Sequence, residues 1–132
     1  MSAEVLQALK AATDGLLYAS ETDSPFELVH WPRKSPTLTG SGLVSLIGKK
    51  PNVRVEEVGL EKFFQDLIQD QDWHDDHDKK IVERYRNLLA VLKKQLTDAK
   101  VFKVGKVQID IYIVGRTSDG EWVGTKTSAV ET

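Results

Sequence analysis

The chain has 132 residues and a net charge of −2 at pH 7, so its length fits one domain and its charge by itself predicts neither a polyanionic nor a polycationic partner. Hydrophobic residues make up 40% and charged residues 29% of the sequence, close to the average of globular proteins, which argues against disorder. The absence of cysteine excludes disulfides, thiolate metal sites and a cysteine nucleophile.

The first ten residues include Glu4 and lack the apolar run that a signal peptide needs. No stretch of the sequence approaches the roughly 20 apolar residues of a membrane span. We therefore expect a soluble cytoplasmic protein that folds as a single domain over residues 1–132.

The first part of the chain begins with a helical pattern. Val5, Leu9 and Ala12 recur at helical spacing, which predicts a helix over residues 3–13 that stops near Gly15. Three segments follow this helix: a short strand or irregular entry at 16–20, a turn-forming loop at 21–25, and a strand at 26–31 that ends before Pro32.

The middle of the chain is richest in turn residues. Three of the four prolines and three of the nine glycines fall between residues 32 and 52, which predicts a loop that encloses a short helix near 41–47. The alternation over residues 53–58 predicts a strand. After Gly59, a helical stripe is expected to be buried, and it consists of Leu60, Phe63, Phe64, Leu67 and Ile68.

The last half of the chain carries the clearest helix. An apolar face at helical spacing predicts a helix over residues 76–97. This face consists of Ile81, Val82, Tyr85, Leu88, Leu89, Leu92 and Leu96. An antiparallel meander is expected to follow, with strands at 101–104, 107–114 and 121–130 and a turn at 118–120. This element order predicts the α+β class, with an antiparallel or mixed sheet and helices on both of its faces.

Charge is divided along the chain. Residues 56–78 contain nine acidic residues and one basic residue, a net −8, whereas residues 79–106 contain nine basic and two acidic residues, a net +7. Two interpretations stay open. In the first, the two blocks face each other or are simply solvated. In the second, the acidic block forms a surface that steers a basic partner.

Catalytic and metal chemistry find little support in the sequence. His74 and His77, with Asp70 or Asp78, could hold a metal ion, but their spacing matches no recurrent zinc signature. No serine-nucleophile elbow and no glycine-rich phosphate cradle are present. The basic block could contact nucleic acid, yet its side chains fall on the solvent side of a helix without a stacking aromatic series. We therefore expect no catalytic residues, no cofactor, no metal of its own and no nucleic-acid partner.

Trp73 is the most informative aromatic residue. It lies between Asp72 and His74 in a predicted loop where no periodicity requires burial. It could fold back as a lid on the core, or it could be an exposed anchor of the kind found at the centres of protein interfaces. Trp122 alternates with Val123 in a terminal strand, which favours a packing role.

Three blocks, in this order and spacing, resemble the nuclease A inhibitor family nearly from end to end. They are residues 12–27, the Gln71-Asp72-Trp73 loop, and the tail from residues 107–117 through 129–132. The resemblance implies a three-layer α-β-α sandwich like that of the pathogenesis-related PR-1 proteins. It also implies a monomeric, non-catalytic protein that forms a one-to-one complex with a sugar-nonspecific ββα-metal endonuclease and occludes its magnesium-containing active site.

The resemblance also assigns roles to five residues. Glu21 matches the acid that pairs with an active-site arginine of the nuclease, where a carboxylate mimics the scissile phosphate. Asp72 and Trp73 match the loop pair that packs beside the nuclease cleft. Thr132 matches a terminal residue whose hydroxyl and carboxylate approach the nuclease magnesium, a hard cation that prefers oxygen ligands, and Glu131 is expected to aim it.

Residues 32–52 look little like the corresponding stretch of that family, and residues 75–80 also differ from it in detail. An alternative is therefore an interaction module of the same fold that binds a different, basic protein partner. An enzyme or metal protein built on His74 and His77 is the other alternative.

Overall fold

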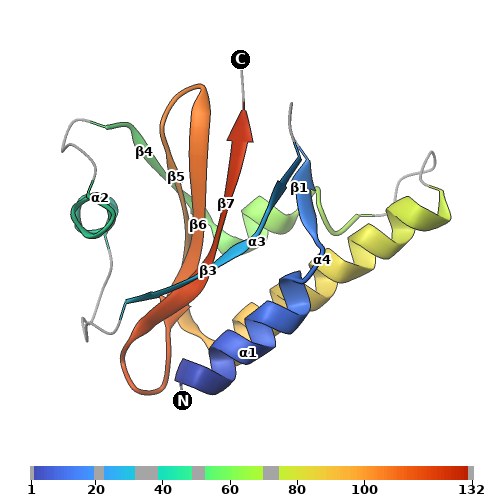
Figure 1. Cartoon of the computed structure of the whole chain (residues 1–132), viewed down its shortest axis with the longest axis horizontal. Coiled ribbons are helices and arrows are strands. Elements are labelled where there is room, and N and C mark those ends of the chain that lie inside the picture. The colour runs from blue at the N-terminus through green and yellow to red at the C-terminus, as the bar shows by residue number, and fades with distance from the viewer. Residues whose placement is uncertain (1, 20–22, 32–38, 49–52, 70–74, 131–132) are drawn as a thin grey trace.

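The computed structural model describes residues 2–19, 23–31, 39–48, 53–69 and 75–130, and Figure 1 shows their arrangement. In chain order the elements are α1 (Ser2–Thr13), β1 (Leu17–Ala19), β2 (Asp23–Pro25), β3 (Glu27–Trp31), α2 (Gly40–Leu46), β4 (Val55–Gly59), α3 (Leu60–Phe64), α4 (Asp76–Gln95), β5 (Thr97–Val104), β6 (Gln108–Arg116) and β7 (Trp122–Val130). The described residues thus form four helices, a five-stranded sheet and a separate hairpin, which confirms the α+β class. None of these helices has the length and apolar character needed to cross a membrane.

The five strands of the main sheet lie in the order β3-β7-β6-β5-β4 and pair antiparallel throughout. The strands β5, β6 and β7 form the predicted meander. Because β7 lies between β6 and β3, the last strand of the chain is an interior strand. Gly124, near its middle, pairs with Val29 on one side and Val114 on the other. The strands β1 and β2 pair only with each other, as a hairpin.

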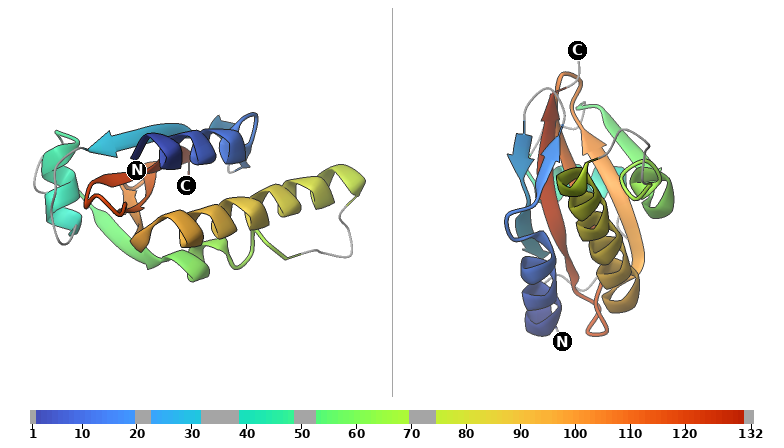
Figure 2. Two further views of the ribbon diagram at one scale, coloured as in Figure 1. Left: turned by 90° about the horizontal axis from the view of Figure 1, so that it is seen from below. Right: turned by 90° about the vertical axis from the view of Figure 1, so that its right-hand side faces the viewer.

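One face of the sheet packs against α1 and α4, which lie side by side (Figure 2). The spacing that predicts these helices is also the spacing that buries their side chains, since Leu9 of α1 and Leu88 and Leu92 of α4 are fully buried. They meet alternate residues of β6, namely Ile109, Ile111 and Ile113. Burial of this apolar surface is the main stabilising contribution to the fold.

The intervening residues of the same strands point away from this core and form a second cluster. It contains Leu43 of α2 together with Phe102, Val104, Tyr112, Val114 and Trp122. Trp122 is 1% exposed, which confirms its predicted packing role. The strands β5, β6 and β7 therefore contribute to two apolar clusters at once. Because both clusters are closely packed, the sheet is a rigid support for the segments that follow its strands.

The loop predicted over residues 21–25 is wrong in its second half, because Asp23–Pro25 forms β2. Asp, Ser and Pro have low strand propensity, so the pattern gives no sign of a strand here. This segment pairs with β1 and is also held by a distant residue. The Thr127 hydroxyl donates to the backbone carbonyls of Pro25 at 3.0 Å and of Ser24 at 3.4 Å.

Two other boundaries differ from the prediction. The helix α3 ends at Phe64, although Leu67 and Ile68 beyond it still pack against the core. The strand β5 begins at Thr97, directly after α4, rather than near residue 101. Its first residues contain a bulge, where Asp98 adopts a φ of 53°. Irregular backbone of this kind leaves no periodic signal.

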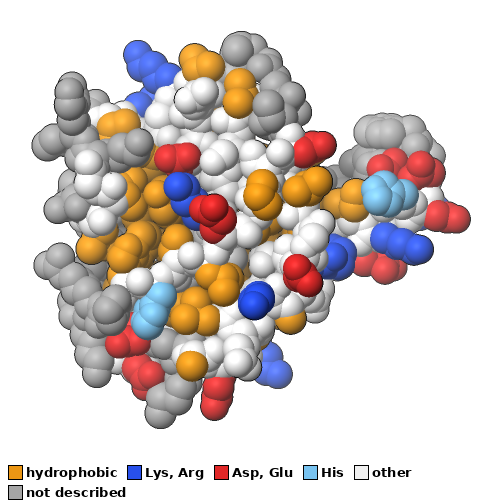
Figure 3. Space-filling view, in the orientation of Figure 1, with side chains coloured by type: hydrophobic (Ala, Val, Ile, Leu, Met, Phe, Trp, Pro, Cys, Tyr) orange, Lys and Arg blue, Asp and Glu red, His pale blue; other side chains and the backbone are white. Residues whose placement is uncertain are grey.

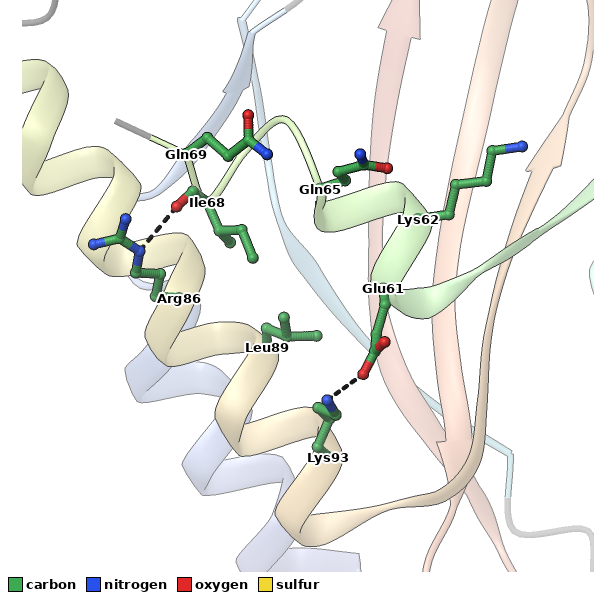
Figure 4. A pocket seen from close by; sticks show the side chains of 8 residues that line it. All are labelled: Glu61, Lys62, Gln65, Ile68, Gln69, Arg86, Leu89 and Lys93. Carbon is green, nitrogen blue, oxygen red and sulfur yellow. Dashed lines mark hydrogen bonds and ion pairs between the residues drawn. The ribbon is translucent and has the colours of Figure 1, made fainter. Parts of the chain in front are cut away.

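The acidic and basic blocks meet at two pairs of charged residues, one of which lines a pocket of about 930 Å³ between α3 and α4 (Figure 4). Lys93 of α4 is ion-paired with Glu61 of α3, and Lys100 Nζ lies 3.8 Å from Glu57 Oε1. The Lys93 ammonium holds the pKa of the Glu61 carboxyl below its ordinary value of 4.5. For these two pairs the interpretation that the blocks face each other is confirmed, whereas steering of a basic partner stays a prediction.

Replacing Lys93 with methionine is expected to return the pKa of Glu61 toward 4.5. A carboxyl whose pKa is lower in the folded state stabilises the fold above its unfolded pKa, and this contribution is lost as the pH falls through the folded value. The variant should therefore be slightly less stable than the wild type at neutral pH and equal to it in acid, since exposed ion pairs contribute little. Carbon-detected NMR titration and urea unfolding at both pH values measure this. A stability difference that is the same at both pH values would refute the role of the pair.

Candidate functional site

The five contact residues expected from the sequence are outside the described residues: Glu21, Asp72, Trp73, Glu131 and Thr132. The structure does describe the chain on either side of them. Ala19 and Asp23 flank residues 20–22, Asp75 follows residues 70–74, and Val130 precedes the last two residues. The candidate site is therefore built from three supports, which are the β1–β2 hairpin, the start of α4 and the end of β7.

The hairpin is held from both sides by side-chain hydrogen bonds to its backbone. The Tyr85 hydroxyl of α4 donates to the Leu17 carbonyl of β1 at 2.8 Å. On the other strand, the Thr127 hydroxyl of β7 donates to the carbonyls of Ser24 and Pro25. A two-stranded hairpin is marginal on its own, so these bonds fix the position of the segment that it carries.

Aromatic packing adds to this support. The Tyr18 ring stacks on Phe63 with centroids 5.8 Å apart, and Phe26 meets Tyr85 edge to face at 6.3 Å. Burial, with smaller contributions from Tyr18 and the charge of Asp23, raises the pKa of Tyr85 above its ordinary value of 10.0. The phenol thus stays protonated at neutral pH and keeps donating to the hairpin.

Replacing Tyr85 with phenylalanine is expected to lower the free energy of unfolding by about 1–2 kcal/mol, because the Leu17 carbonyl loses its donor while the ring still packs. Chemical denaturation measures this change. Tyr112→Phe is the matched control, since the described residues supply no hydrogen-bond partner for its hydroxyl. An effect no larger than that of the control would mean that the Tyr85 hydroxyl does not hold the hairpin.

The start of α4 is fixed by a capping box. The Asp75 carboxylate accepts from the Asp78 backbone N–H at 2.8 Å, and the Asp78 carboxylate accepts from the Asp75 N–H at 3.3 Å. The first of these bonds is the main reason that the pKa of Asp75 lies below its ordinary value. The helix therefore begins at a defined residue, directly after the segment that contains Asp72 and Trp73.

The end of β7 is paired almost to the last residue of the chain. Val130 lies opposite Gln108 and Ala129 opposite Ile109. Residues 131 and 132 thus follow an ordered interior strand. In Figure 1 the end of β7 and the end of the hairpin where β1 stops and β2 starts lie at the same end of the sheet, opposite to the start of α1. Both hairpin strands also contact β7. The structure therefore brings together the supports of residues 20–22 and 131–132.

A groove of about 360 Å³ connects the hairpin with the start of α4. Its lining residues come from the hairpin, from the turn after α3 and from α4, and they are Leu17, Ala19, Asp23, Asp66, Leu67, His77, Asp78, Ile81, Val82 and Tyr85. The start of α4 is thus joined to the hairpin through a common concave surface.

The metal site considered from the sequence has no support from the described side chains. Within the described ranges, no three His, Cys, Asp or Glu side chains gather closely enough to hold a metal ion. His74 and Asp70 lie outside those ranges, whereas His77 is in the first turn of α4 and exposed.

Sequence reasoning missed the residues that hold the site. Tyr85 appeared only as a member of an apolar stripe, and Thr127 as one position of a strand. Their hydroxyl contacts join residues 68 and 102 positions apart along the chain, so no local pattern contains them. One signal in the sequence could have pointed to the Tyr85 contact. A tyrosine within an apolar helical stripe indicates a hydrogen bond inside the protein, because a buried tyrosine hydroxyl usually has a partner.

A family model described as nuclease A inhibitor-like protein matches residues 3–132, which includes every element from α1 to β7 and all five expected contact positions. No curated protein was found to be similar to this sequence.

Proposed function

Since the chain belongs to the nuclease A inhibitor-like family, we propose that it inhibits a sugar-nonspecific DNA/RNA endonuclease by forming a one-to-one complex that occludes the magnesium-containing active site. The protein acts by contact and carries out no catalysis. It does so as a cytoplasmic monomer, a single domain over residues 1–132, with the three-layer α-β-α sandwich of PR-1-like proteins.

The observation that carries the proposal is the support given to the expected contact segments. The hairpin that flanks Glu21 is bonded to α4 through Tyr85 and to β7 through Thr127, and β7 itself leads into Thr132. An inhibitor gains affinity when its contact groups are held in place before binding, because little conformational entropy is then lost. Two ordered supports at one end of the sheet suit such a role.

The proposed chemistry assigns a different task to each segment. The Glu21 carboxylate pairs with an arginine of the nuclease active site and takes the place of a phosphate. The Thr132 hydroxyl and carboxylate approach the nuclease magnesium, with Glu131 orienting them. Asp72 and Trp73 pack beside the cleft, where a tryptophan supplies a large contact area.

The proposal is tested by digesting single-stranded DNA and RNA with a purified ββα-metal nuclease in the presence of increasing amounts of this protein. Inhibition of both substrates is expected, and excess substrate should relieve it because the two compete for one cleft. Inhibition of DNA digestion without inhibition of RNA digestion, or the reverse, would contradict occlusion of the active site. Inhibition that excess substrate does not relieve would also contradict it.

The second candidate function is an interaction module that binds a different basic protein. It is favoured by residues 32–52, which look little like the family's corresponding stretch. This candidate predicts that the nuclease is neither bound nor inhibited, so the same digestion assay separates the two.

A further inference from the structure

The groove between the hairpin and α4 is lined by described residues that flank two of the proposed contact segments in the sequence. Its lining includes Ala19 and Asp23, the described residues on either side of residues 20–22, and His77 and Asp78, which open α4 just after residues 70–74. A nuclease that contacts both segments would therefore cover the groove. The inference below rests on the proposed function for this reason.

The floor of the groove is apolar and open to solvent. Leu17 is 46% exposed, and it shares the floor with Ile81 and Leu67. A neighbouring pocket of about 610 Å³ shares Leu17, His77 and Ile81 with the groove and is also lined by the charged residues Lys80, Glu83 and Arg84 of α4. Figure 3 shows hydrophobic side chains at the surface between the hairpin and the start of α4.

The rim of the groove is acidic. Among the described lining residues, Asp23 of β2, Asp66 after α3 and Asp78 of α4 are acidic, His77 carries an imidazole, and none is a lysine or arginine. Asp78 is engaged in the capping box. The side chains of Asp23 and Asp66 have neither an ion pair nor a hydrogen bond with any other described residue. Two carboxylates without a partner among the described residues thus line one concave surface from different elements.

An apolar floor with an acidic rim is complementary to a long cationic side chain, which buries an aliphatic stem and keeps a charged head. A purely apolar occupant would remove water from Asp23 and Asp66 without pairing them, which is unfavourable. An anion would be repelled. We propose that the groove receives an arginine or lysine side chain of the nuclease, with its stem on Leu17 and Ile81 and its charged head between Asp23 and Asp66.

The test measures association and dissociation of the nuclease by surface plasmon resonance for Asp23→Asn, Asp66→Asn and the double variant. Each single change is expected to weaken binding by roughly tenfold, mainly through faster dissociation, since truncating one partner of a buried charge pair acts on the dissociation rate. Glu4→Gln is the matched control, because Glu4 is an exposed carboxylate in the first turn of α1, at the opposite end of the molecule. Thermal unfolding of all four variants should equal that of the wild type.

A further variant, Leu17→Asn, tests the floor and should also weaken binding. Weakening by Leu17→Asn but by neither aspartate variant would mean an apolar occupant and would overturn the assignment of a cation. A slower association rate with unchanged dissociation in the aspartate variants would mean long-range steering, and would also overturn it. Wild-type protein that binds no nuclease would overturn the proposed function and the groove together, whereas tight binding that none of these variants changes would overturn the groove alone.

Discussion

Glu21→Ala and removal of Thr132 are each expected to weaken inhibition of the nuclease by at least about 30-fold, which corresponds to roughly 2 kcal/mol of binding free energy. In the proposed complex the Glu21 carboxylate neutralises an active-site arginine, so its truncation leaves that arginine buried and unpaired. Removing Thr132 deletes the hydroxyl and shifts the terminal carboxylate by one residue, about 3.3 Å along an extended chain. Inhibition constants from nuclease digestion measure both effects.

Conservative variants separate the contributions. Glu21→Gln keeps the shape and one acceptor oxygen and should fall between the wild type and Glu21→Ala. Thr132→Val keeps the terminal carboxylate and removes only the hydroxyl. Glu4→Ala, at the other end of the molecule, should inhibit like the wild type. Equal inhibition by all of these variants would show that neither Glu21 nor Thr132 contacts the active site.

Gly124→Ala is expected to lower the free energy of unfolding by about 3 kcal/mol, near the upper end of what overpacking a core costs. A Cβ at this position would lie 2.0 Å from the Ile113 carbonyl oxygen and 2.7 Å from the Val114 Cα. Both are backbone atoms of the neighbouring strand β6, so no side-chain rotation relieves the clash. A loss of this size is large beside the 5–15 kcal/mol that stabilises most domains. Urea unfolding measures it.

Gly59→Ala is the matched control for this prediction. A Cβ at Gly59 would come no closer than 4.0 Å to Lys62 Cβ, and the backbone there has a φ of −62° that alanine also adopts. The cost should stay within about 1 kcal/mol, mainly from a poorer helix N-cap. Similar losses in both variants would show that close approach of β6 and β7 is not the reason for glycine at position 124.

The longest elements could be predicted because their own side chains determine them. Leu9 of α1 and Leu88 of α4 recur with helical spacing, and the Ile109, Ile111 and Ile113 series alternates along β6, so periodicity alone places these residues in the core. β2 could not be predicted because its three residues have low strand propensity, while the contacts that hold them include Thr127, about a hundred positions away. Tertiary contacts outweigh local propensity in so short a strand.

The candidate site divides in the same way. The three blocks that resemble the nuclease A inhibitor family name Glu21, Asp72 and Thr132, and the match of the family model over residues 3–132 confirms the family. The roles of these residues stay a prediction. The groove could not be foreseen, because Asp23 and Asp66 are brought to one surface only by the packing of the hairpin against α3 and α4. Such proximity of distant residues leaves no pattern in the sequence.

The most direct test of the central claim is a titration of a fixed amount of ββα-metal nuclease with the wild-type protein, at nuclease concentrations well above the dissociation constant. Nuclease activity is expected to fall in a straight line and to end at one molecule of this protein per molecule of nuclease. Full activity in the presence of a large molar excess of the protein would contradict the account.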